Sequence, residues 1–422
     1  MHHITAALLA VASCASIAQA QSSAPSSAGA PFTLEQALAL AGKSAPALQA
    51  ATASVRVAEA GRTVAGYRPN PSIIAETENV AGSGQYRGIR SAETTIGLAL
   101  PVELGGKRSA RIAVADAMGN RARISAVLAE ADLRLAITQT YIEAVSAERR
   151  VATAQEQAGI AREALRAASI RVRAGRASPL EQQRADVVRI NAETAVERTE
   201  LLAAVARDNL QRRIGQPIAG PLDQAWFDRV EDYGPGRSTD SVGTLALVAA
   251  RVDVTMAEAQ VRLAQSQRIP DVTLSASARR LAATNDVAAV FGVSIPFPLF
   301  NNGRAAVSQA RAQRDQADAL GRAVEMDSAQ SIAIAEADVE NAATSARMTS
   351  GPVLAAAREA ARIARIGYRE GKFGQLDLLD AERTLSETRT AAIDALATYH
   401  DARARRDRLT AAAPNFQKVQ NR

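Results

Sequence analysis

Four short stretches of the chain alternate between apolar and polar positions. They lie at 72–80, 95–102, 272–279 and 291–297, and each neighbouring pair is joined by a loop rich in turn-forming residues. Alternation with a period of two is typical of a strand with one apolar and one polar face. Strands of about ten residues are long enough to cross a bilayer at a tilt. The pattern therefore predicts two strand pairs, at about 72–104 and 271–299.

Long helical patterns follow each strand pair. The stretch 105–174 contains no proline. The stretch 303–371 contains one proline, Pro352, which should bend or interrupt its helix. At 1.5 Å per residue each long helix would extend roughly 100 Å. Shorter helices are expected at 179–214 and 376–410, so each long helix should fold back as a hairpin at a glycine-containing turn. Two further helical segments, Thr33 to Tyr67 and Leu245 to Arg268, lead into the strand pairs.

The two halves of the chain repeat one plan. The motif LPVELGGKR at 100–108 corresponds to IPFPLFNNGR at 295–304, and the equivalent turn glycines Gly175 and Gly371 lie 196 residues apart. A repeat of this kind indicates a duplication. We therefore expect a first repeat at 21–214 with its hairpin at about 105–214, an inter-repeat or equatorial linker at 215–243, a second repeat at 244–412 with its hairpin at about 303–410, and a C-terminal tail at 413–422.

Composition favours long, narrow helical packing over a thick core. Hydrophobic residues make up 47% of the chain, but aromatic residues only 3%, and much of the apolar fraction is alanine. Charged residues are interspersed with these alanines, which is typical of coiled coil. The formal net charge is +6, yet the 50 Lys and Arg are scattered among 44 acids. Nucleic-acid binding is therefore not expected, because it requires a clustered basic face.

The N-terminus has the pattern of a targeting segment. Ile4 to Ala18 is uncharged and mostly apolar, and small residues precede a cleavage position after Ala20. Residues 1–20 are therefore predicted to be a signal peptide, which implies export. The only cysteine, Cys14, follows a sequence that resembles a lipobox. Lipidation of Cys14 is the alternative to signal peptidase I cleavage after Ala20, and we favour cleavage because the segment before Cys14 is very short.

Four strands per chain pose a closure problem in a membrane. An open sheet edge leaves backbone groups unpaired in hydrocarbon, and single-chain barrels begin at eight strands. Symmetric association solves the problem, since three copies provide twelve strands. The predicted fold class is an α+β membrane protein, mainly long α-helices, with a periplasmic α-barrel and a trimeric 12-stranded transmembrane β-barrel.

The chain resembles the TolC family of outer-membrane efflux proteins. The resemblance rests on the opening FTLEQAL at 32–38, the duplicated strand–helix plan and the glycine-containing hairpin turns. The motif PVELGGKR at 101–108 is similar to the subgroup of cation (heavy-metal) efflux systems. The resemblance implies a homotrimer in outer-membrane lipid, extending into the periplasm, where it meets a periplasmic adaptor (membrane fusion) protein and an inner-membrane pump of the resistance–nodulation–division (RND) type.

The second hairpin turn carries the most informative candidate residues. Asp377 and Asp380 are three residues apart and should share one helix face. By resemblance this position lines the periplasmic mouth, where six carboxylates in a trimer would favour cations. The alternative is that both acids serve a helix N-terminus. The further gate candidates are Tyr368, Glu181 and Arg184, and the turns that by resemblance dock the adaptor are marked by Gly175, Ser178, Leu180, Gly371, Gly374 and Leu376.

No enzymatic or cofactor chemistry is expected. GGKRS at 105–109 lacks the earlier glycine of a phosphate-binding loop and has Arg108 where that loop needs Ser or Thr. After signal removal His400 is the only histidine, and no Cys or His cluster offers transition-metal ligands. The interpretation is a passive efflux channel, exporting divalent heavy-metal cations. The alternatives are a drug, small-molecule or type I secretion channel of the same family, and, from another class, a soluble periplasmic coiled-coil adaptor or scaffold.

Overall fold

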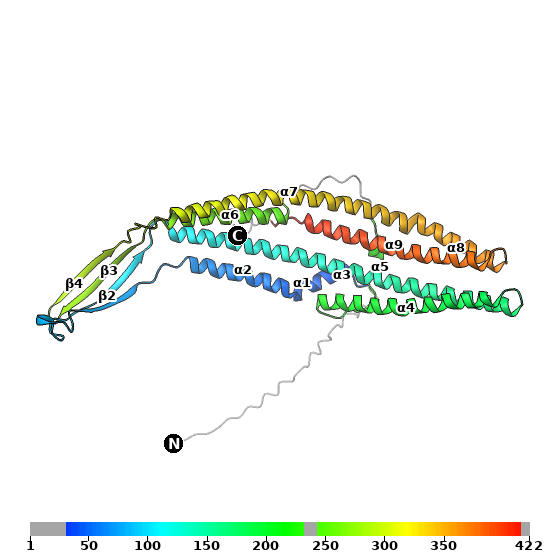
Figure 1. Ribbon diagram of the computed structural model, residues 1–422, viewed down its shortest axis with the longest axis horizontal. Helices are drawn as coiled ribbons and strands as arrows, with labels where there is room; N and C mark the ends of the chain where they lie inside the picture. Colours follow the sequence, from blue (N-terminus) through cyan, green and yellow to red (C-terminus); the bar gives the residue numbers. More distant parts are fainter. Residues whose placement is uncertain (1–30, 232–242, 415–422) are drawn as a thin grey trace, which may run out of the picture.

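The chain is an elongated bundle of long helices with a four-stranded sheet at one end. The computed structural model describes residues 31–231 and 243–414, and Figure 1 shows the sheet, the bundle and two hairpin turns at the opposite end. The predicted signal peptide, Cys14 and Ala20, and most of the C-terminal tail lie outside the described residues. The predicted mainly helical fold with four strands is confirmed.

The sheet is antiparallel, with the order β1-β2-β3-β4. Its strands are β1 (Ser72–Glu78), β2 (Glu93–Val102), β3 (Val272–Leu281) and β4 (Val287–Ser294), and a short 3₁₀ helix, η1 (Gly84–Tyr86), lies in the first loop. The central pairing of β2 with β3, in which Leu100 lies opposite Leu274, joins the two repeats. Among the residues that the structure describes, β1 and β4 are therefore left as free edges.

The sheet is apolar on its exposed face. Ile96 on β2 is 60% exposed and Phe291 on β4 is 80% exposed, whereas Thr95 and Ala99 on the opposite face are buried. This is the reverse of a water-soluble sheet, in which the apolar face is covered. The alternation predicted from sequence is thus present, and no segment in the described part of the chain covers its apolar face.

The strand predicted to reach Phe297 is shorter than expected. β4 ends at Ser294, and residues 295–303 form an irregular segment before the next helix. Pro296 and Pro298 account for the correction, because proline has no backbone N–H to donate to a sheet. The exposed side chains of Phe297 and Phe300 lie in this segment.

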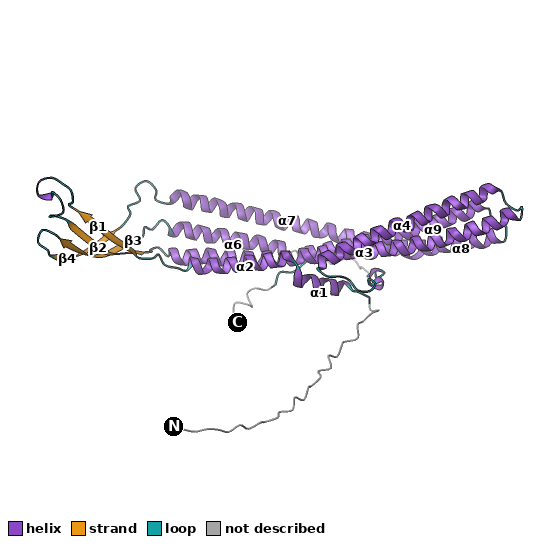
Figure 2. Cartoon of the chain, turned by 90° about the horizontal axis from the view of Figure 1, so that it is seen from below, coloured by secondary structure: helices purple, strands orange, loops and turns teal. Residues whose placement is uncertain are grey.

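The helices form two sections that share α3 (Lys107–Arg173). Near the sheet, α3 packs with α2 (Pro46–Ala65) and α6 (Leu245–Ser266), and α6 in turn packs with α7 (Arg304–Met348). Beyond mid-height, α4 (Pro179–Ile214) continues the row of α2, and α9 (Gln375–Leu409) continues the row of α6, as Figures 1 and 2 show. Among the described residues, none of the helices combines the length and hydropathy needed to cross a membrane.

Two prolines break helices. The segment predicted as one helix from Thr33 to Tyr67 is instead α1 (Leu34–Ser44) and α2, because Ala45 is held in an extended conformation before Pro46. The predicted interruption at Pro352 is observed: a π-helical segment, Thr349–Val353, separates α7 from α8 (Leu354–Arg369). The second long helix is therefore jointed, whereas α3 is continuous.

Mid-height holds the main core. Tyr141 on α3, Leu210 on α4, Val339 on α7 and Tyr399 on α9 are all fully buried there. The segment predicted as a linker contributes to this core through α5 (Gln224–Phe227), where Phe227 is fully buried. Toward the hairpin turns the buried residues are mostly alanines, in small clusters.

Candidate functional site

Two hairpin turns form the end of the molecule farthest from the sheet, here called the tip. The first joins α3 to α4, and Ser178 caps α4 by accepting a hydrogen bond from the N–H of Leu180 at 3.2 Å. The second joins α8 to α9. Gly175 and Gly371 have φ angles of +64° and +75°, which residues other than glycine rarely adopt. These glycines allow both hairpins to reverse over a few residues.

Tyr368 and Glu181 connect the two hairpins. The Tyr368 hydroxyl donates a hydrogen bond to the Glu181 carboxylate at 2.5 Å, and Gln375 donates to the Glu181 carbonyl oxygen at 2.7 Å. The Arg171 guanidinium lies 4.7 Å from the centre of the Tyr368 ring and 3.6 Å from the Glu181 carboxylate. We call Arg171, Glu181, Tyr368 and Gln375 the tip joint. Two gate candidates from opposite repeats therefore meet within one chain.

Burial keeps the Tyr368 hydroxyl protonated, so it remains a hydrogen-bond donor. Tyr368 is only 4% exposed, and burial together with the Glu181 carboxylate raises its pKa to about 12. The phenol therefore stays protonated over the physiological pH range. A hydrogen bond to a carboxylate is worth more than one between neutral groups, about 1.5–3 kcal/mol.

The acidic pair lies just beyond this joint. Asp377 and Asp380 occupy the first two turns of α9 and are exposed. The Asp377 carboxylate accepts a hydrogen bond from the N–H of Gly374 at 2.9 Å, so it does cap its helix. Arg184 is exposed and forms no ion pair with any residue in the described part of the chain. The structure brings Tyr368 to Glu181 and leaves Asp377, Asp380 and Arg184 exposed.

The outer surface of the tip is partly apolar. Leu180 is the second residue of α4 and is 56% exposed, and Leu376 is the second residue of α9 and is 65% exposed. Both lie immediately after their turns, at equivalent places in the two repeats. The turn residues named from sequence, including Ser178 and Gly374, therefore surround two exposed leucines.

Sequence reasoning missed the residues that support the joint from below. Arg365 on α8 makes a bidentate ion pair with Glu382 on α9, whose side chain is buried. The pair borders a cavity of 240 Å³ between the two hairpins, which Tyr368 and Leu378 also line. The available signal was their similar distance from the turn, since positions equally far from a hairpin turn face each other.

Gly367 was also missed. A β-carbon at this position would lie 2.1 Å from the Phe373 ring. The carbonyl oxygen of Gly367 accepts hydrogen bonds from the N–H groups of Lys372 and Phe373. The absence of a side chain thus lets the turn fold its aromatic ring onto the end of α8.

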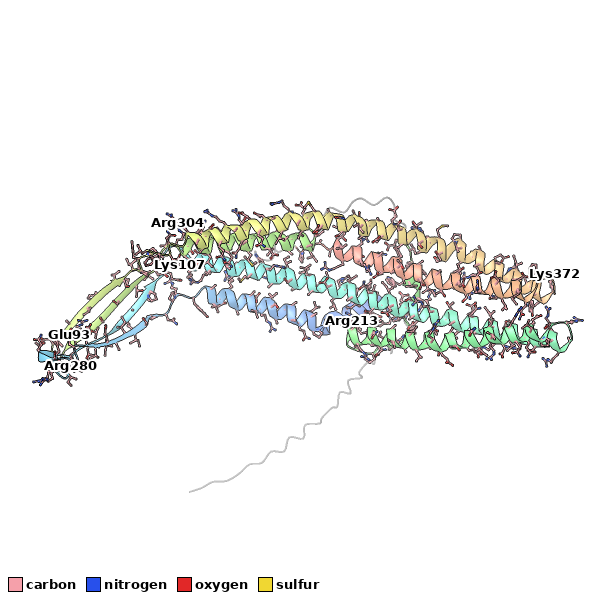
Figure 3. The ribbon with its side chains drawn as sticks, in the orientation of Figure 1. Glu93, Lys107, Arg213, Arg280, Arg304 and Lys372 are labelled. Atoms are coloured by element: carbon pink, nitrogen blue, oxygen red, sulfur yellow. The ribbon has the colours of Figure 1, made fainter. Side chains whose placement is uncertain are left out.

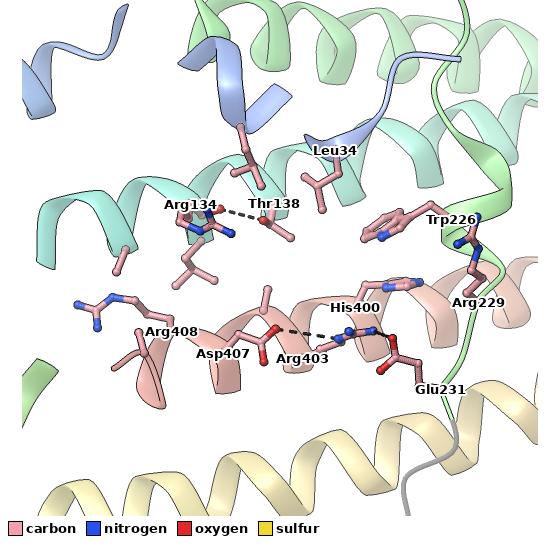
Figure 4. Close-up of a pocket in the computed structure, with 15 residues that line it drawn as sticks. Leu34, Arg134, Thr138, Trp226, Arg229, Glu231, His400, Arg403, Asp407 and Arg408 are labelled. Carbon is pink, nitrogen blue, oxygen red and sulfur yellow. Dashed lines mark hydrogen bonds and ion pairs between the residues drawn. The ribbon is translucent and has the colours of Figure 1, made fainter. Parts of the chain in front are cut away.

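A second polar cluster lies at mid-height and is shown in Figure 4. His400 is buried, stacks on Trp226 with ring centroids 4.2 Å apart, and shares a 2.9 Å hydrogen bond with the carbonyl oxygen of Phe227. Burial lowers the pKa of His400. A 330 Å³ cavity opens beside it, and Arg403 at its edge pairs with Glu231 at 2.8 Å. These contacts give His400 a structural role.

Residues 31–231 and 243–414 hold no cluster of three or more His, Cys, Asp or Glu side chains arranged to bind a metal ion. The chemistry at the tip is therefore that of dispersed exposed carboxylates and one internal hydrogen-bonded joint.

The chain matches the family described as "Outer membrane efflux protein" over residues 37–216 and 243–412. It is 31% identical to the cobalt-zinc-cadmium resistance protein CzcC of Cupriavidus metallidurans, over 91% of each chain. It is 32% identical to the nickel and cobalt resistance protein CnrC of the same organism, over 66% of each chain. The fold is similar to crystal structures of CusC, with a TM-score of 0.76, 16% identity, and coverage of 90% of this chain and 92% of that one.

Proposed function

The chain belongs to the outer membrane efflux protein family, and we propose that three copies of this outer-membrane channel form a conduit that exports divalent heavy-metal cations. The conduit is passive. It receives its cargo from an inner-membrane pump of the RND type through a periplasmic adaptor. The observation that carries the cargo assignment is the similarity to CzcC, a cobalt-zinc-cadmium resistance protein, along nearly the whole chain.

The free sheet edges support the homotrimer. β1 and β4 have no partner strand on their outer sides within the described residues, and the exposed face of the sheet is apolar. Pairing β4 of one copy with β1 of the next satisfies both edges and closes the sheet at twelve strands. The apolar side chains, including Ile96 and Phe291, then face lipid.

The tip residues support a gate at the periplasmic end. The tip joint holds the two hairpins of each copy together, which keeps the mouth narrow. Asp377 and Asp380 lie next to the joint and are exposed, so three copies would place six carboxylates around the mouth. A ring of this kind attracts cations and excludes anions. Leu180 and Leu376, with the turns around Gly175, Ser178, Gly371 and Gly374, provide the apolar surface for the adaptor.

Metal tolerance tests the cargo. Deletion of the gene should lower the growth limit for zinc, cobalt or cadmium, and expression of the intact chain should restore it. Growth with dyes and antibiotics is measured in parallel. Unchanged metal tolerance with greater sensitivity to dyes or antibiotics would show that the cargo is a drug or another small molecule.

Ion selectivity tests the acidic pair. The double variant Asp377→Asn with Asp380→Asn should lose cation preference in planar bilayers, because the mouth loses six charges. Glu325→Gln with Asp327→Asn is the matched control, since these two exposed acids lie on α7, far from the tip. Equal selectivity in both double variants would remove Asp377 and Asp380 from the gate.

A further inference from the structure

The junction between the sheet and the helices carries a surplus of positive charge. The chain crosses this junction four times, at 66–71, 103–111, 266–271 and 295–304, and these segments contain six basic residues and two acids. Every crossing contributes at least one Arg or Lys. Figure 3 shows Lys107 and Arg304 at this level, where the long helices begin.

Both acids in these segments already form ion pairs. Lys107 pairs with Asp271 at 2.7 Å, and Arg111 makes a bidentate pair with Glu103. The basic residues that remain are exposed and have no carboxylate partner within the described part of the chain; we call them the junction arginines: Arg68, Arg108, Arg268 and Arg304. Arg108 and Arg268 donate only to backbone carbonyl oxygens, of Gly66 and Asn302.

An exposed apolar segment adjoins these arginines. Phe297 is 85% exposed and Phe300 is 98% exposed, and Leu299 lies between them. The segment begins directly after β4 and ends at Arg304, so it joins the sheet to the basic level of the junction. Aromatic side chains next to arginines suit the boundary between acyl chains and headgroups.

The opposite end of the sheet differs in charge. Segments 76–93 and 279–286 contain four basic residues and four acids. Arg279 there pairs with Glu93 at 2.9 Å and with Glu78 at 3.1 Å. Figure 3 shows Glu93 and Arg280 at that end. The positive surplus is therefore confined to the end of the sheet that faces the helices.

We propose that the junction arginines bind anionic phospholipid headgroups in the periplasmic leaflet of the outer membrane. Guanidinium groups match phosphate oxygens in geometry and charge, and their long stems reach along an apolar surface to the headgroup level. Three copies place twelve junction arginines around the barrel. The inference rests on the proposed trimer and on the sheet spanning the membrane, and it adds the class of lipid that surrounds the channel.

Quenching by brominated lipids tests this. The Phe300→Trp protein carries one reporter at the junction, while the native Trp226 lies at mid-height and provides an unquenched reference. In vesicles that mix phosphatidylglycerol with phosphatidylcholine, brominated phosphatidylglycerol should quench the reporter as though enriched about fivefold, the preference expected for one basic residue near a membrane surface. Arg268→Gln with Arg304→Gln removes two of the four junction arginines and should therefore reduce this enrichment.

Two further variants keep the result interpretable. Arg268→Lys with Arg304→Lys should retain most of the enrichment, and Arg213→Gln, an exposed arginine far from the junction in Figure 3, should retain all of it. Equal quenching by the two lipids in the Phe300→Trp protein, or unchanged enrichment in the Gln variant, would overturn the proposal. Metal tolerance and conductance are measured separately, so a wrong cargo would leave the lipid preference in place.

Discussion

Mid-height and the tip join the same two hairpins by different means. At mid-height, Tyr141 and Tyr399 are fully buried, and α5 wedges Phe227 between α3 and α9. At the tip, the hairpins meet through the hydrogen bond between Tyr368 and Glu181, above a 240 Å³ cavity. Packed aromatic cores resist deformation, whereas a polar joint over a cavity has few contacts to break. From this comparison we infer that mid-height is the fixed part of the proposed channel and the tip is its movable part.

The largest loss of stability is expected from Tyr141→Ala. This change removes a fully buried ring and two hydrogen bonds, one donated to the carbonyl oxygen of Phe32 at 2.7 Å and one accepted from the N–H of Asp223 at 3.0 Å. The free energy of unfolding should fall by about 3–5 kcal/mol, the usual range for a large buried aromatic residue changed to alanine. Thermal unfolding followed by circular dichroism measures it. An unchanged unfolding temperature would show that mid-height is not the anchor of the bundle.

A smaller loss of stability is expected from Arg365→Gln below the tip joint. It leaves the buried Glu382 carboxylate without its guanidinium partner, at a cost of about 1–3 kcal/mol. Arg362→Gln is the matched control on the same helix, because its pair with Glu359 is exposed and such pairs contribute about 0–1 kcal/mol. Limited trypsin digestion should cut near Arg369 faster in Arg365→Gln. Equal digestion of the two variants would argue against a supporting role for the buried pair.

His400 at mid-height should make the stability of the protein depend on pH. Burial, and next the charge of Arg403, favour neutral His400, while Phe227, Asp228 and Glu231 favour its charged form; the net effect is a lowered pKa. A lowered folded-state pKa means that the stabilisation is present above the unfolded pKa of about 6.5 and is lost as the pH falls below it. The unfolding temperature should therefore drop between pH 7 and pH 5, and this drop should shrink in His400→Gln. An identical drop in both proteins would assign it to other groups.

The contribution of the tip joint should not depend on pH near neutrality. The raised pKa of Tyr368, about 12, means that its contribution is complete below pH 10 and is lost only as the pH rises through 12. Channel conductance should therefore not change between pH 7 and pH 9 on account of Tyr368. A tyrosine titration within that range, followed by ultraviolet absorbance and absent in Tyr368→Phe, would contradict the buried joint.

Much of this arrangement follows from sequence patterns. Alternation at 95–102 and 272–279 located the two central strands, and Gly175 and Gly371 located both hairpin turns. Where the pattern was wrong, a proline had overridden it: Pro46 splits the first helix, and Pro296 ends the last strand early. These are local effects of a single residue type, which periodicity alone does not weigh.

The contacts of the site were harder to predict. Glu181 and Tyr368 were both named as gate candidates, but their contact spans 187 positions and depends on how α3 of the first hairpin packs against α9 of the second. Glu382 was not named, because a single buried acid in a polar helix looks like any exposed one until its partner Arg365 is placed. The packing of Phe227 was likewise hidden within a proline- and glycine-rich segment that resembled a linker.

Single-channel conductance of two tyrosine variants tests the comparison most directly. Tyr368→Phe removes the hydroxyl at the tip, and Tyr399→Phe removes the hydroxyl that accepts a hydrogen bond from the N–H of Glu231 at mid-height. Loss of a hydrogen bond to a carboxylate should favour the open tip about tenfold per copy. We predict higher conductance for Tyr368→Phe and unchanged conductance for Tyr399→Phe. Equal conductance in the two variants would contradict a fixed mid-height and a movable tip.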